Sequence, residues 1–131
     1  VDIDVTSVSG NDITVEVNAE FLENMTGNYG VVVWITEDDI YDWQTNYAGT
    51  GDPQYAVGNI EQYKHEHVLR DNLSSIWGDA ITVASNSGEQ ETFTFNYTAD
   101  SSWDLSKCSI VAWVTNIDTK EVVNVEEEHV Q

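Results

Sequence analysis

The feature that most constrains the fold is a repeated alternation of apolar and polar residues. In residues 91–97, Phe93 and Phe95 alternate with threonines. The same period of two recurs in residues 1–6 and 12–19, and a short turn separates these two runs. A period of two places successive side chains on opposite faces, as in a β-strand with one buried face. The sequence therefore predicts antiparallel sheet structure that begins with a hairpin.

Two further runs, residues 31–35 and 110–114, are apolar without alternation, which is typical of strands buried on both faces. Short strands are also expected at residues 81–84 and 121–125, the latter closing a second hairpin. The three glutamates after residue 125 are expected to fray into solvent. The predicted core consists of Val33, Ile35, Phe93, Phe95, Cys108, Ile110 and Val114.

These short strands, separated by turn residues and with almost no helical pattern, predict an all-β fold. We expect an antiparallel two-sheet β-sandwich of immunoglobulin or fibronectin type III character. A closed barrel is the alternative. The chain has 131 residues and 40% apolar content, which favours a single domain over residues 1–131.

Charge excludes one class of partner. Lys and Arg together number 4 against 24 Asp and Glu, which gives a net charge of -20. Proteins bind nucleic acid by neutralising phosphates with basic side chains, so nucleic acid is not an expected partner. No apolar run approaches the roughly 20 residues that span a bilayer, so no membrane-spanning segment is expected in this sequence.

Residues 39–59 show no period and contain several glycines and a proline, so they are predicted to form a long loop. The loop is rich in aromatic residues, which argues against disorder. We favour the interpretation that these rings cap one end of the sandwich. The alternative is a platform that binds a sugar or a protein. The residues in question are Tyr41, Trp43, Tyr47 and Tyr55.

Residues 63–70 are predicted to form one strand, in which His65 and His67 share a face. Two imidazoles at this spacing suit a zinc ion, provided that a third ligand comes from elsewhere. Glu37, Asp39 and His129 are candidates for that ligand. Structural hydrogen bonding of the two histidines is the favoured interpretation, because clustered ionisable groups often serve structure.

The acidic cluster Glu37, Asp38, Asp39 and Asp42 could bind calcium, which takes six to eight oxygen ligands, but a solvated acidic loop is the favoured interpretation. Arg70 is expected to pair with Glu37 or Asp38, and ligand recognition by Arg70 is the alternative. No cofactor is predicted; calcium and zinc are kept as alternatives. The sequence contains no complete catalytic motif, so an enzyme is not expected.

Three segments of the chain resemble a known family. They are Ile35-Thr36-Glu37-Asp38-Asp39-Ile40 followed by Gln44, then Tyr63-Lys64-His65-Glu66-His67-Val68-Leu69-Arg70, then Trp77-Gly78. Together they resemble the C-terminal domain of the outer-membrane-protein-28-related proteins, surface lipoproteins of Bacteroidetes-type bacteria. The resemblance covers residues 31–125, and residues 65–70 are its most specific part.

The resemblance implies an exported protein at the outer-membrane surface, with a binding or assembly role and a protein or glycan partner. In that family a thioredoxin-like domain commonly precedes this one, and this sequence has neither such a domain nor a cysteine pair. The family transfers no catalytic residues. The leading hypothesis is therefore a non-catalytic binding or assembly domain. The alternatives are a carbohydrate-binding module that uses residues 39–59 and, more remotely, a metalloenzyme built on His65 and His67.

Overall fold

The structure is a computed structural model, and it describes residues 1–46 and 58–131. These residues form ten β-strands and one short 3-10 helix, η1. In chain order the elements are β1 (Asp2–Ser9), β2 (Asp12–Glu20), β3 (Tyr29–Glu37), β4 (Ile40–Asn46), β5 (Gly58–His65), β6 (Val68–Asn72), β7 (Asp79–Ala80), β8 (Gln90–Thr98), η1 (Leu105–Lys107), β9 (Cys108–Asn116) and β10 (Val122–His129). The predicted all-β class is confirmed.

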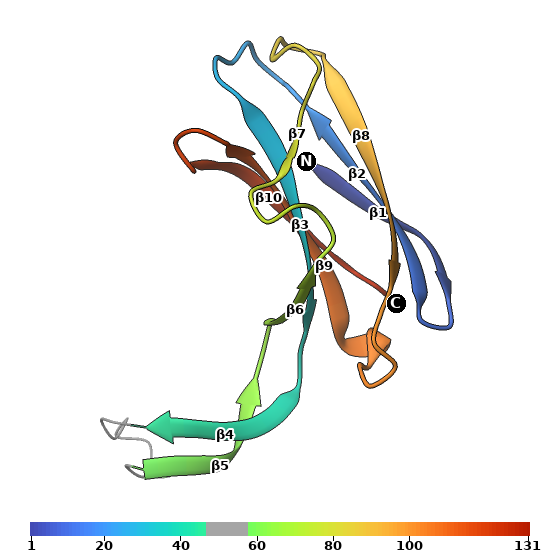
Figure 1. The fold of residues 1–131 in the computed structure, drawn as a ribbon, viewed down its shortest axis with the longest axis vertical. Helices are drawn as coiled ribbons and strands as arrows, with labels where there is room; N and C mark the ends of the chain where they lie inside the picture. Colours follow the sequence, from blue (N-terminus) through green and yellow to red (C-terminus); the bar gives the residue numbers. More distant parts are fainter. Residues whose placement is uncertain (47–57) are drawn as a thin grey trace.

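Most of the strands build two antiparallel sheets that pack face to face. The smaller sheet has the order β1-β2-β8, and the larger sheet has the order β10-β9-β3-β6, with β7 also paired to β3. Figure 1 shows the two sheets beside each other. The predicted sandwich is confirmed, as are the predicted hairpins β1–β2 and β9–β10. The immunoglobulin or fibronectin subtype and the single domain over residues 1–131 stay predictions.

The core lies between the two sheets. The larger sheet contributes Val33, Ile35 and Ile110, and the smaller sheet contributes Val15 and Val17, all of them fully shielded from solvent. Each apolar side chain that is buried in this way stabilises the fold by about 1.5–3 kcal/mol. The sandwich is therefore held together mainly by β2, β3 and β9.

Most of the predicted core residues are buried, namely Val33, Ile35, Cys108, Ile110 and Val114. Phe93 and Phe95 are only partly buried, although they pack against the core. The reason is their position on β8, which is an outer strand of the smaller sheet. Side chains on an outer strand lack a neighbouring strand on one side, so alternation predicted their direction correctly and overestimated their burial.

The prediction of a loop over residues 39–59 is wrong for residues 40–46, which form β4, and for residues 58–59, which begin β5. The β4 side chains from residues 41 to 45 are all exposed. Alternation reports a strand only when one face is buried, so a strand that is exposed on both faces leaves no period in the sequence. The described part of this segment is therefore a strand that the pattern could not reveal.

Three smaller predictions also need correction. The strand expected over residues 63–70 is interrupted at residues 66–67, between β5 and β6. The glutamates at 126–128 do not fray, because their backbone pairs with β9 within β10. The strand expected at residues 81–84 is replaced by β7 at residues 79–80. The glutamates at 126–128 can stay in the strand because their side chains face solvent while their backbone groups form the hydrogen bonds of the sheet.

The strands β4 and β5 form a two-stranded ribbon, here called the arm, that extends from the sandwich. In Figure 1 the arm leaves the lower end of the larger sheet and points away from β1, β2 and β8. It continues the pairing of β3 with β6: Glu37 lies opposite Val68, and three residues further along each strand Ile40 lies opposite His65. The arm is thus an extension of one hairpin in an unchanged register.

Candidate functional site

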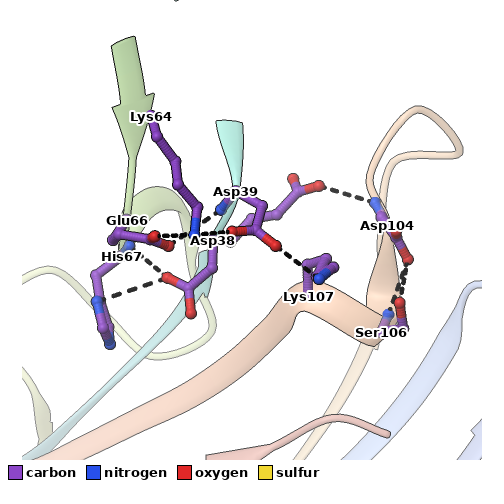
Figure 2. A network of polar contacts seen from close by, with 9 residues as sticks. Asp38, Asp39, Lys64, Glu66, His67, Asp104, Ser106 and Lys107 are labelled. Atoms are coloured by element: carbon purple, nitrogen blue, oxygen red, sulfur yellow. Dashed lines mark hydrogen bonds and ion pairs between the residues drawn. The ribbon is translucent and has the colours of Figure 1, made fainter. Parts of the chain in front are cut away.

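The hairpin bends where the sandwich ends and the arm begins, at residues 38–39 and 66–67. Asp39 and His67 adopt left-handed backbone conformations, with φ of 60° and 51°. Asp38 Oδ1 accepts a hydrogen bond from the His67 N–H at 2.6 Å, and Glu66 Oε2 accepts one from the Asp39 N–H at 3.2 Å. Carboxylates from each strand thus replace the carbonyl acceptors that a regular ladder would supply (Figure 2).

Two lysines hold the bend from opposite sides. Lys64 lies 2.5 Å from Asp39 Oδ1 and 2.6 Å from Glu66 Oε1, while Lys107 donates to Asp39 Oδ2 at 2.6 Å. Two hydrogen bonds lower the pKa of Asp39 to about 2, the larger effect coming from Lys107 and the smaller from Lys64. The same bonds raise the pKa of both lysines. Because Lys107 belongs to η1, Asp39 connects the arm to the sandwich.

A further ion pair, between Arg70 and Glu37, lies just inside the sandwich. Arg70 Nε donates to Glu37 Oε2 at 2.7 Å, and Glu37 Oε1 accepts a hydrogen bond from the Asp104 N–H at 2.9 Å. Glu37 is only 6% exposed, and the guanidinium of Arg70 also lies 5.7 Å from the ring centroid of Trp103. The predicted pairing of Arg70 is confirmed, with Glu37 as its partner. Ligand recognition by Arg70 stays a prediction.

The two histidines lie in different surroundings. The ring of His65 packs edge-on against Tyr63, with 4.9 Å between the centroids. His67 lies beyond the end of β5, with Nδ1 at 3.5 Å from an Asp38 oxygen and Nε2 at 3.4 Å from a Glu127 oxygen. The expectation that both histidines stand on one uninterrupted strand is wrong, because the bend separates them.

The predicted metal ligands already have protein partners. Glu37 binds Arg70, Asp39 binds two lysines, and Asp38 accepts a backbone hydrogen bond. Within residues 1–46 and 58–131, no group of three or more His, Cys, Asp or Glu side chains is arranged to hold a metal ion. Metal binding by Glu37, Asp38, Asp39, His65 and His67 stays a prediction.

Two of the four predicted aromatic residues lie on the arm and are exposed. Tyr41 is 58% exposed and Trp43 is 59% exposed. The favoured interpretation, that these two rings cap one end of the sandwich, is therefore wrong. The pairing of β4 with β5 shifts between Asp42 and Gln44, and Trp43 lies at this irregularity. Such bulges re-aim side chains. The other two residues, Tyr47 and Tyr55, lie outside the described residues.

Sequence reasoning missed Lys64, Glu66 and Lys107, although the sequence contained a signal for them. Lys64, Arg70 and Lys107 are three of only four basic residues in the chain. Scarce cations in an acidic chain are expected where carboxylates must approach each other closely. The scarcity of positive charge could therefore have indicated the bend, although not which acid each lysine contacts.

Comparison with known proteins assigns the chain to a family. A family model described as outer membrane protein Omp28 matches residues 1–131. The chain belongs to the Omp28 family. The resemblance seen in the sequence is confirmed, and so is the expected location at the outer membrane, because the matched family is described as an outer membrane protein. No curated protein matches the chain.

A solved structure shares this Omp28 fold. It is the crystal structure of a domain of the outer membrane lipoprotein Omp28 from Porphyromonas gingivalis. The TM-score is 0.63 and the sequence identity is 22%, and the match covers 98% of this chain and 90% of that chain. Sandwich and arm together are therefore comparable with a single crystallised domain. In the described residues of this chain, no helix has the length and apolar character needed to cross a membrane.

Proposed function

We propose that this Omp28 domain is a non-catalytic binding or assembly domain of the outer-membrane surface and that the arm is its contact element. The observation that carries the proposal is the exposure of Tyr41 and Trp43 on a ribbon that extends beyond the sandwich. Aromatic side chains are enriched among the residues that dominate protein interfaces. A partner that covered these rings would remove a large apolar area from water.

The construction of the arm supports this proposal. An isolated two-stranded ribbon is marginally stable in water, and this one is fixed at its base by Asp39, Lys64 and Lys107. A base held in this way lowers the conformational entropy that binding must remove. The backbone groups along the outer edges of β4 and β5 also offer hydrogen bonds to an added strand.

The charged groups at the bend support a role other than catalysis. General acid catalysis at neutral pH needs a carboxyl group with a raised pKa, whereas the pKa of Asp39 is lowered to about 2. Asp39 and Glu66 are engaged with lysines, and Glu37 with Arg70. These contacts stabilise the shape of the bend, and they lower the pKa of Asp39, whereas a general acid would need it raised.

The experiment measures retention of the fluorescently labelled domain on outer-membrane vesicles from the bacterium that carries the gene. Replacing Tyr41 and Trp43 together by alanine should reduce retention about tenfold or more, because a hot-spot aromatic contributes about 2 kcal/mol or more. Leu22→Ala is the matched control, since Leu22 is 82% exposed and lies on the sandwich. Equal retention of the double variant and the wild type would reject the arm as the contact element.

The same vesicles separate the two classes of partner. Loss of retention after protease treatment supports a protein partner, and loss after periodate oxidation supports a glycan. The glycan result would favour a carbohydrate-binding module, for which the exposed rings of Tyr41 and Trp43 are the supporting observation.

A further inference from the structure

The outer face of the larger sheet contains an apolar groove that is separate from the arm. It has a volume of about 240 Å³. Its lining residues come from β3, β9, β10 and the segments beside them: Val32, Trp34, Ile76, Trp77, Trp113, Thr115, Lys120 and Val122. Three of the five tryptophans of the chain therefore line one groove. We call it the tryptophan groove.

The walls of the groove are fixed by packing. Trp34 and Trp113 meet edge to face, with 4.6 Å between the ring centroids and 88° between the ring planes. Gly78 has φ of 95°, and a Cβ at this position would lie 3.2 Å from a methyl group of Val32. The chain beside Trp77 thus lies close against the sheet, where only glycine fits without displacing a neighbour. The groove is built by the fold.

Exposed apolar side chains gather around the groove. Trp77 is 67% exposed, Ile76 is 68% exposed and Val122 is 55% exposed. Val125, also 55% exposed, lies opposite Trp113 in the pairing of β10 with β9. Contiguous exposed apolar surface is uncommon on monomeric soluble proteins and marks interaction sites. The outer face of the larger sheet is therefore a candidate interface.

The polar groups of the groove are few, and their chemistry narrows the choice of occupant. The Thr115 hydroxyl is already within hydrogen-bond distance of the Glu121 and Asn116 carbonyls. Lys120 Nζ lies 4.7 Å from the ring centroid of Trp77. Sugar sites need several placed polar groups as well as aromatic rings, so this lining suits an apolar side chain better than a sugar. Among the described residues, Trp34 Nε1 is shielded from solvent and has no hydrogen-bond acceptor.

The net charge decides between the remaining occupants. The chain carries a net charge of -20, so a second copy would bring strong repulsion. Glu127, on the same face of β10 as Val125, adds negative charge beside the apolar surface, whereas Lys120 is the one charged residue of the lining itself. A partner with positive charge complements the net charge of the chain. We infer that the tryptophan groove binds a polypeptide segment that inserts one large apolar side chain and flanks it with lysine or arginine.

The test uses random dodecapeptides displayed on phage, selected against the intact domain. Enriched peptides should combine a large apolar residue with Lys or Arg, and a synthetic copy labelled with fluorescein should bind the domain in an anisotropy titration. Trp77→Ala and Val122→Ser should each weaken that binding about tenfold, which corresponds to about 1.4 kcal/mol. Added sodium chloride should weaken it as well, because salt screens the charge attraction.

Control variants separate this site from the arm. Val123→Ala changes an exposed valine that does not line the groove, and it should leave peptide affinity unchanged. Trp43→Ala should also leave it unchanged while reducing vesicle retention, so the two proposals fail independently. Circular dichroism melting establishes that each variant is folded.

Five outcomes would overturn the inference. Four of them are selection of acidic or purely polar peptides, no enrichment at all, affinity unaffected by both groove variants, and dimers in light scattering that Trp77→Ala abolishes. The last would make a second copy the occupant. Binding to an array of polysaccharides that is lost in Trp77→Ala would instead make a glycan the occupant.

Discussion

The strands β3 and β4 follow each other directly in the chain and continue one hairpin, yet their surroundings are opposite. Every residue of β3 except the half-buried Trp34 is buried, whereas residues 41–45 of β4 are all exposed. The pairing register is the same on both sides of the bend. Backbone pairing is therefore common to the two regions, and what differs is the source of stability. Apolar burial stabilises β3, while ionic contacts at its base hold the arm.

The largest difference between the regions should appear on truncating a core side chain. Ile35 is fully shielded between the sheets, and Ile35→Ala should lower the free energy of unfolding by about 2–5 kcal/mol because it leaves a cavity. Urea denaturation followed by circular dichroism measures this. A loss below about 1 kcal/mol would show that the core collapses around the substitution and that the contrast with the arm is overstated.

The next effect concerns the ion pair at the boundary between the two regions. Arg70→Met should lower the free energy of unfolding by about 2 kcal/mol, between the values for exposed and buried pairs, because Glu37 is nearly buried and Arg70 is partly exposed. Lys120→Met is the matched control, since Lys120 contacts a tryptophan ring. If both variants lower the free energy of unfolding equally, the pairing of Arg70 with Glu37 does not stabilise the fold more than an exposed lysine contact does.

A smaller, pH-dependent effect should come from the base of the arm. The pKa of Asp39 is lowered from 3.8 to about 2 when the chain folds, so its carboxylate stabilises the fold above that ordinary value and loses this contribution as pH falls through 2. The melting temperature of the wild type should exceed that of Asp39→Asn at neutral pH. The difference should shrink as pH falls from about 4 to about 2. Asp2→Asn, which removes an exposed acid on β1, is the control. If its melting-temperature difference from the wild type changes with pH in the same way, the effect does not come from the contacts of Asp39 with the lysines.

The smallest effect on stability should come from the arm itself. Trp43→Ala should change the free energy of unfolding by less than about 0.5 kcal/mol, because the ring is exposed and its loss leaves no cavity. Denaturation in urea provides the measurement. A destabilisation similar to that of Ile35→Ala would mean that the ring packs on the sandwich in solution, and the arm would then be part of the core.

The same contrast explains what the sequence could predict. Alternation and apolar runs report burial, so they located β1, β2, β8 and β9 and most of the core. The arm escaped because a ribbon exposed on both faces has no periodic signal. At the bend, the acids at 37–39 were recognised as unusual, but their roles depend on Lys64 and Lys107, which the register and η1 bring to them. Such contacts are set by tertiary geometry and have no local signature. The tryptophan groove was missed for a similar reason, since Trp34, Trp77 and Trp113 are far apart in the chain.

The unchanged register across the bend has a consequence for how such domains can diversify. Because Glu37 faces Val68 on one side and Ile40 faces His65 on the other, equal numbers of residues added to or removed from β4 and β5 leave every sandwich side chain on its original face. The arm can therefore be lengthened or shortened, down to a two-residue Asn-Gly turn that joins β3 to β6, while the sandwich that presents it is kept.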